Sequence, residues 1–122
     1  MWYNAATIVN YAAKSKDLWS VPCPIFVRAL AMEGGMGPVA SAAHHGMIMR
    51  MPGIAVCAPM TPGEWTEAWN WFTTHDDPIY VSEHRRSFAI DYEMDDLLED
   101  RADITILAIS ATRLNALEAK KR

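Results

Sequence analysis

The stretch from Pro52 to Arg86 constrains the fold more than any other part of the chain. It contains two short apolar runs, at residues 54–58 and at the start of residues 79–86, which are rich in β-branched and aromatic residues. Proline or glycine bounds each run, as is typical of buried strands. A helical pattern fills the space between them, so the stretch predicts strand, helix, strand. Such a crossover between parallel strands is right-handed in nearly all proteins.

The helix between these two strands has clear start signals. Thr61 suits the N-cap, Pro62 the first helical position, and Glu64 follows Thr61 by three residues, as a capping box requires. Four apolar residues are spaced as one face of this helix, and we expect them to pack on the sheet: Trp65, Ala68, Trp69 and Phe72. Trp71 lies off this predicted face.

Helices alternate with strands along the rest of the chain. The predicted helices are residues 4–16, 40–50 and 112–121, and the further predicted strands are residues 25–30 and 103–109. This alternation favours an α/β fold, a parallel sheet with helices on both faces. Residues 87–103 are acidic and predict a linker with at most a short helix near residues 95–98. One strand and one helix beyond it are too little to fold alone, so we expect the fold to be incomplete at both ends.

Composition excludes several classes of protein. Of the 122 residues, 51% are hydrophobic, which is enough for the packed core of one domain or of a piece of a larger one. The formal net charge of −4 argues against a nucleic-acid partner, and no Lys/Arg cluster suggests a membrane surface. Polar residues interrupt the apolar N-terminus, so we expect no spanning helix and a cytoplasmic location. Cys23 and Cys57 are expected to be buried free thiols.

Three polar stretches follow predicted elements near the carboxyl ends of strands, where open parallel sheets bind ligands. Residues 33–38 form a glycine-containing loop that matches no phosphate-binding fingerprint, so an ordinary flexible loop is the alternative. His44 and His45 are adjacent on a predicted helix and point about 100° apart, which disfavours a shared metal ion. We therefore predict no metal site. One of these two histidines faces a cleft and relays protons, or both lie on a solvated helix face.

Residues 83–86 are the third polar stretch. Glu83 and His84 are neighbours in a predicted strand and face opposite sides, so they do not form a catalytic pair. Arg85 and Arg86 have the chemistry to hold a carboxylate or phosphate. The alternative is an ion-paired strand end, in which these arginines form salt bridges with the acidic linker that follows.

Four stretches in order resemble one enzyme family. They are Ile-Val-Asn-Tyr-Ala-Ala-Lys at residues 8–14, Val-Pro-Cys-Pro-Ile-Phe-Val-Arg at 21–28, Pro-Gly-Ile-Ala-Val-Cys-Ala-Pro at 52–59 with Thr-Pro at 61–62, and Asp-Pro-Ile-Tyr-Val-Ser-Glu-His-Arg at 77–85. Together they resemble the pyrimidine-binding domain of transketolase-like thiamine diphosphate enzymes, most closely the β subunit of 2-oxoacid dehydrogenase E1 components. The resemblance makes residues 1–92 this domain without its N-terminal part. Residues 93–102 would be a linker, and residues 103–122 the start of the C-terminal domain.

The resemblance implies an enzyme whose thiamine diphosphate carries the carbanion chemistry. The glutamate that activates the cofactor and the diphosphate and Mg²⁺ site would lie outside this chain, the latter in an α-type or second subunit of a homo- or hetero-oligomer. Trp2 or Tyr3 would stack on the aminopyrimidine. The backbone carbonyls of residues 75–77 correspond to a site for a monovalent cation. The isolated chain is expected to be inactive.

The chain departs from the family pattern at the position of the family's catalytic histidine. A gap-free count places it at Ala40, whereas His44 and His45 lie one helical turn further along. We therefore take His44 and His45 as the catalytic candidates, one of which would replace the family histidine. The alternatives are a non-catalytic assembly module derived from this fold and an unrelated α/β binding domain.

Overall fold

The computed structural model describes residues 4–32, 37 and 41–120. A sheet of three parallel strands organises the molecule: β1 (Phe26–Ala31), β2 (Ala55–Cys57) and β3 (Ile79–His84). Among the described residues the strand order is β1-β3-β2, so β3 is central and β1 and β2 are the edges. Phe26 and Ala55 both register with Ile79, which aligns the strands at their amino ends. The predicted parallel sheet and the crossover from β2 to β3 are confirmed.

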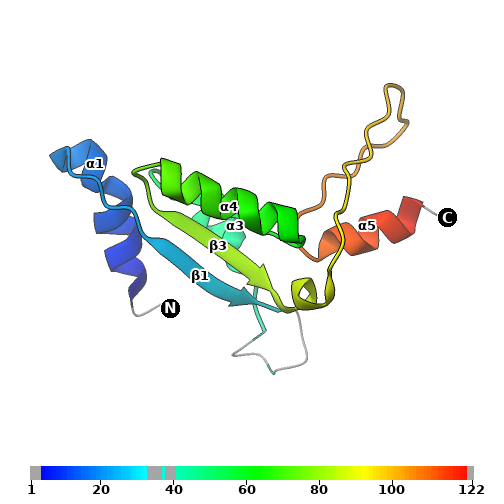
Figure 1. Cartoon of the computed structure of the whole chain (residues 1–122), viewed down its shortest axis with the longest axis horizontal. Coiled ribbons are helices and arrows are strands. Elements are labelled where there is room, and N and C mark those ends of the chain that lie inside the picture. The colour runs from blue at the N-terminus through cyan, green and yellow to red at the C-terminus, as the bar shows by residue number, and fades with distance from the viewer. Residues whose placement is uncertain (1–3, 33–36, 38–40, 121–122) are drawn as a thin grey trace.

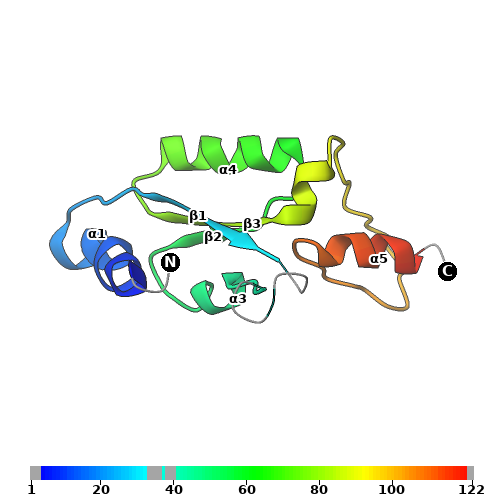
Figure 2. The same cartoon turned by 90° about the horizontal axis from the view of Figure 1, so that it is seen from below.

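Helices cover both faces of this sheet, as Figure 2 shows. Helix α4 (Pro62–Thr74) lies on one face. On the other face lie the N-terminal helix, made of a π-helical part η2 (Thr7–Ala12) and α1 (Ala13–Trp19), and the short α3 (His45–Ile48). Side chains of β3 alternate between the two: Ile79 and Val81 pack under α4, whereas Tyr80 packs with Ile48. The layered α/β architecture is therefore confirmed (Figure 1).

Helix α4 begins as its sequence predicts. The Thr61 hydroxyl accepts a hydrogen bond from the Glu64 N–H, and the Glu64 carboxylate accepts from the Thr61 N–H at 3.3 Å, which completes the capping box. The inner face of the helix is rotated relative to the prediction. Trp71 packs on the core below the helix, whereas Trp69 keeps 54% of its surface exposed and reaches only the rim at Phe26. The prediction that Trp71 lies off the inner face is wrong.

Gly53 sets the distance between the N-terminal helix and the turn before β2. Its φ is +80°, a left-handed conformation that glycine adopts without strain. A Cβ at this position would lie 1.8 Å from the carbonyl oxygen of Ala13. The helix can therefore pack against this turn only because residue 53 has no side chain.

Helix α3 is much shorter than the predicted helix at residues 40–50. Residues 41–44 are irregular, and the Met32 N–H donates to the Ala42 carbonyl at 3.2 Å. This bond ties the incoming chain to the end of β1 and competes with helix formation there. Ala40 lies outside the described residues, as do residues 33–36 and 38 of the predicted loop.

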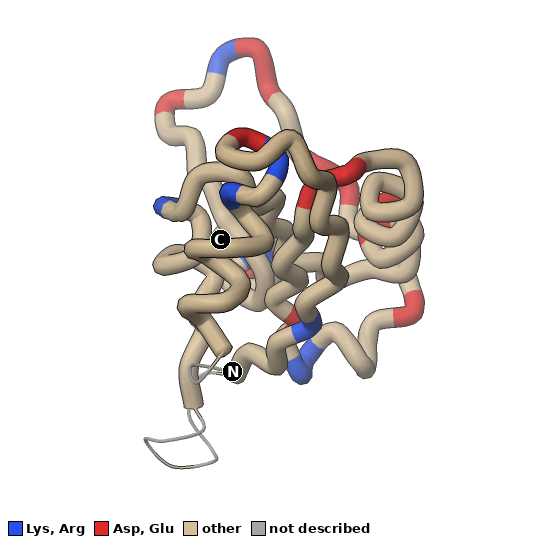
Figure 3. Tube along the Cα trace, turned by 90° about the vertical axis from the view of Figure 1, so that its left-hand side faces the viewer, with Lys and Arg blue, Asp and Glu red and all other residues tan. Residues whose placement is uncertain are grey.

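The C-terminal part departs most from the prediction. Residues 103–109 are not a strand: Ile104 is 82% and Leu107 is 93% exposed, and no strand among the described residues lies beside them to complete their hydrogen bonds. Residues 95–98 are not helical either. Helix α5 (Thr112–Lys120) is confirmed, and Leu114 and Leu117 pack it against Met60 and Met94. Figure 3 shows acidic residues recurring along the loop before α5.

Both cysteines are free thiols, and each is half-buried. Within the described residues, no helix combines the length and apolar character needed to cross a membrane.

Candidate functional site

Polar side chains gather at the carboxyl end of the central strand β3, where parallel sheets place their ligand sites. Ser82, Glu83 and His84 are its last three residues, and all three are buried. Because side chains of a strand alternate, Ser82 faces the α3 side together with Tyr80, whereas Glu83 faces the α4 side together with Val81. The end of one strand thus supplies polar groups to two separate environments.

On the α3 side, His45 reaches the central strand. Its Nδ1 lies 3.0 Å from the Ser82 hydroxyl oxygen. His45 is half-buried, whereas Ser82 is 1% exposed, so the strand fixes the hydroxyl and the hydroxyl orients the imidazole. The structure thus places one of the two predicted catalytic histidines at the predicted end of the sheet.

His44 has a different position in the fold. It precedes α3 as its N-cap, and its backbone carbonyl accepts hydrogen bonds from the N–H groups of Met47 and Ile48. The contact to Ser82 belongs to His45. The predicted cofactor-binding residues Trp2 and Tyr3 lie outside the described residues.

On the α4 side, Glu83 forms a closed ion pair. Its two carboxylate oxygens accept hydrogen bonds from Arg28 Nε at 2.8 Å and Nη2 at 2.7 Å. The guanidinium also lies 5.5 Å from the ring centre of Trp65. Glu83 at the end of β3 is therefore ion-paired with Arg28 of β1. The roles expected for Arg85 and Arg86 stay predictions.

His84 forms hydrogen bonds with the turn that follows β3. Its Nδ1 accepts the Arg86 N–H at 3.1 Å, and its carbonyl accepts the Ser87 hydroxyl at 2.7 Å. These bonds begin the short 3-10 turn η3 (Arg85–Ala89). Glu83 and His84 point to opposite faces, as predicted.

The loop predicted to hold a monovalent cation lies at the other end of the sheet, just before β3. The Asp77 carboxylate binds Lys16 at 3.1 Å, and His75 stacks on Trp71 with 4.2 Å between ring centres. No cluster of metal-ligating side chains occurs within the described residues. The carbonyl site stays a prediction.

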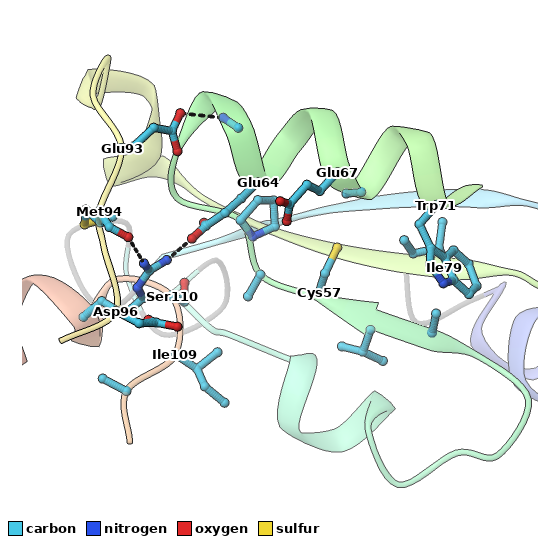
Figure 4. A pocket seen from close by; sticks show the side chains of 18 of the residues that line it. Cys57, Glu64, Glu67, Trp71, Ile79, Glu93, Met94, Asp96, Ile109 and Ser110 are labelled. Atoms are coloured by element: carbon cyan, nitrogen blue, oxygen red, sulfur yellow. Dashed lines mark hydrogen bonds and ion pairs between the residues drawn. The ribbon is translucent and has the colours of Figure 1, made fainter. Parts of the chain in front are cut away.

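A groove of about 850 Å³ runs along the outer edge of β2. Figure 4 shows it between α4 on one side and residues 93–96 and 108–113 on the other. Cys57 lies on its floor, and burial, helped by the nearby Glu64 carboxylate, raises the pKa of that thiol to about 11. At the rim, a hydrogen bond from Thr61, another from the Gly63 N–H and the charge of Arg113 lower the pKa of Glu93.

Sequence reasoning missed two features of this region. Ser82 was not singled out, although strand alternation places it on the same face as Tyr80 and near a strand end. Arg28 was missed because its ion pair joins residues 55 positions apart. The residue pattern within either strand does not predict such a pairing.

The comparisons with known proteins agree with the architecture. Residues 1–90 match the family model described as the transketolase pyrimidine-binding domain. No curated protein and no solved structure matches the chain significantly.

Proposed function

Since this chain belongs to the family of transketolase pyrimidine-binding domains, we propose that it forms the aminopyrimidine side of a thiamine diphosphate site in a larger enzyme. The hydrogen bond between His45 and Ser82 at the carboxyl end of β3 is the observation that carries this proposal. When bound, the cofactor supplies the carbanion chemistry, and the protein supplies orientation and electrostatics.

The described residues fit one part of the cofactor. His45 and Ser82 offer a donor and an acceptor of the kind that an aminopyrimidine edge or a substrate carbonyl would meet. Arg28 is held by Glu83 and Trp65 on the opposite face, so it is engaged away from this pair. The described residues contain no metal-binding cluster. We therefore assign the diphosphate and its Mg²⁺ to a second, α-type subunit, and the stacking of the pyrimidine to Trp2 or Tyr3.

His45 is the residue that holds a proton in this proposal. If the Ser82 hydroxyl donates to Nδ1, then Nε2 carries the proton and can donate it to a substrate oxygen. If Nδ1 donates to Ser82, then Nε2 is an acceptor and can remove a proton. In both cases Ser82 holds Nδ1 and orients the imidazole. His45 then takes the role of the family's histidine, whose position is Ala40 in this chain. The more specific proposal, that the chain is part of a 2-oxoacid dehydrogenase E1 β-like subunit, depends on His45 replacing the family's histidine.

Titration of the full chain with thiamine and with thiamine diphosphate plus Mg²⁺, followed by nuclear magnetic resonance, tests the proposal. We expect weak, millimolar binding of both ligands with similar affinity, because only their shared pyrimidine end contacts this chain. The signals of His45 and Ser82 should shift. Micromolar binding of the diphosphate form alone, or unchanged signals at His45, would overturn the assignment.

Two matched variants sharpen this test. His45→Ala should abolish the shift at Ser82, whereas His44→Ala should leave it in place. Ser82→Ala should change the tautomer balance of His45, read from its two ring nitrogen signals, without changing that of His44. Equal responses of the two histidines would contradict a specific role for His45.

A non-catalytic assembly module is the second candidate function. The rings of Tyr11 and Trp19 stack at 6.2 Å on the N-terminal helix, with 60% and 54% of these residues exposed. Exposed aromatic pairs of this kind favour a protein interface. Two results together would favour the assembly module. Thiamine would leave the His45 signals unchanged, and Trp19→Ala would abolish binding to a partner subunit.

A further inference from the structure

The groove beside β2 has the features of a strand-binding site. It lies along an edge of the sheet, because in the described part of the chain β2 pairs with β3 on one side and with no strand on the other. Its volume of about 850 Å³ falls within the range of ligand pockets. This groove is separate from the His45–Ser82 pair, which lies on β3 and α3.

The backbone of β2 is directed into this groove at one residue. The Ala55 N–H donates to the Pro78 carbonyl at 3.0 Å, so Ala55 turns its backbone groups toward β3. In a parallel ladder every second residue does so. The N–H and carbonyl of Val56 therefore point to the outer edge, in the orientation that an added strand requires.

The walls of the groove are apolar near the strand. Ala68 and Trp71 of α4 lie above it, and Ile109 stands on the other side. The Cys57 thiol on the floor stays uncharged well above neutral pH, because burial raises its pKa to about 11. Small and apolar surfaces of this kind suit the side chains of an extended segment.

The rim of the groove is acidic. Arg113 donates to the Met94 carbonyl at 2.8 Å and forms an ion pair with Glu64, so these two charges cancel. The remaining charged residues that line the groove are exposed carboxylates: Glu67, Glu93, Asp95 and Asp96. An occupant that carries Lys or Arg beside its strand would complement them.

We propose that this groove binds an extended, basic segment of a partner protein, which adds as a fourth strand to β2. Backbone hydrogen bonds at Val56 hold the segment, its apolar side chains contact Ala68 and Trp71, and its basic residues meet the acidic rim. A second copy of this chain fits poorly, because its net charge is −4 and its unpaired apolar residues 104–109 follow an acidic loop. The proposal does not depend on the proposed cofactor site.

Titration of the full chain with the synthetic probe acetyl-Lys-Lys-Val-Thr-Val-Lys-Lys-amide tests this proposal. We expect saturable binding that weakens at high salt, with a downfield shift of the Val56 amide proton. The same peptide with glutamate in place of lysine should bind at least tenfold more weakly. Equal binding of the two peptides would overturn the role of the acidic rim.

Two methylated probes test the strand geometry. One carries N-methyl groups on both valines and the other on the threonine, so each blocks the central amides along one edge of the peptide. Addition to a sheet edge uses one edge only, and one of the two probes should therefore lose binding while the other keeps it. Equal effects of the two methylations would contradict strand addition.

Variants of the chain locate the site. Val56→Pro removes the outward N–H of β2 and should weaken the probe at least tenfold. Leu30→Pro is the matched control, because it removes an outward N–H from the opposite edge of the sheet, at β1, and should leave binding unchanged. The double variant E67K/D96K, on the surface, should also weaken binding and guards against misfolding of Val56→Pro. The proposal would be overturned if the probe still binds both Val56→Pro and the double variant. It would also be overturned if the chain binds no peptide but forms a dimer that Val56→Pro dissociates.

Discussion

The two faces of β3 differ in how their polar side chains are hydrogen-bonded. On the α4 face, Glu83 is bound by Arg28 through two hydrogen bonds and lies under a helix of thirteen residues. On the α3 face, Ser82 meets the single side chain of His45, which belongs to a helix of four residues. The first arrangement uses the donors and acceptors of its pair for stability. In the second, Nδ1 of the imidazole lies 3.0 Å from the Ser82 hydroxyl, and it is on this face that the proposed function rests.

The largest expected effect comes from the packing that holds the α3 face together. Gly53→Ala should lower the free energy of unfolding by at least about 3 kcal/mol, because its Cβ would overlap the Ala13 carbonyl and its φ is +80°. Denaturant unfolding measures this loss. Gly46→Ala in α3 is the control: nothing lies within 4 Å of its added Cβ, so it should be neutral or slightly stabilising. Similar effects of the two substitutions would contradict the tight contact at Gly53.

A smaller loss should follow when the α4 face is opened. Glu83→Ala removes both hydrogen bonds to Arg28, and we expect it to cost about 1–2 kcal/mol, since the Arg28 side chain is 60% exposed and water partly replaces its partner. Glu83→Gln should recover part of this loss. Thiamine-induced shifts at His45 should persist in both variants. Loss of those shifts would show that the two faces are coupled.

The sequence allowed the position and start of α4 to be predicted, but neither the side of this helix that is buried nor the short α3 on the opposite face. Residues 52–79 carry their boundary signals locally, because the capping box at Thr61 and the prolines act within a few residues. The apolar spacing of α4 did not reveal that Trp71 rather than Trp69 is buried, because that depends on how the helix lies on the sheet. The short α3 could not be predicted, because the bond from Met32 to Ala42 that restricts it joins separate elements.

The same physics explains the wrong strand at residues 103–109. The composition of this segment favours a strand, but a strand also needs a neighbour, which periodicity alone does not supply. The contact of His45 with Ser82 was likewise predictable only as a choice between two histidines, because it depends on how α3 is seated over β3.

The capping box tests how much of the stability on the α4 face is local. Thr61→Ala removes the acceptor for the Glu64 N–H and should cost about 1 kcal/mol of unfolding free energy. Thr66→Ala is the control within the same helix, because its exposed hydroxyl donates to the Pro62 carbonyl and the loss of this bond should cost little. Thermal unfolding followed by circular dichroism measures both. Equal losses would mean that the cap does not limit this helix.

The smallest effect separates the two faces by pH. Cys57 packs on the α4 face and Tyr80 on the α3 face, and burial raises the pKa of both. Each group therefore stabilises the fold in its protonated form, and this contribution is lost as the pH rises from the unfolded pKa through the folded one. Cys57 acts from pH 9 to about 11, whereas Tyr80 begins only near pH 10.

Between pH 9 and 10 the loss should thus come from Cys57, and it should stay below about 1 kcal/mol because the thiol is only half-buried. Cys57→Ala should flatten the decline of unfolding free energy in this interval, and Tyr80→Phe should flatten it only above pH 10. Because each substitution removes one titrating group from one face, the order of the two effects reports which face releases its proton first. A decline between pH 9 and 10 that Cys57→Ala leaves unchanged would show that water reaches the Cys57 thiol. It would also contradict the apolar groove floor on which strand addition at β2 depends.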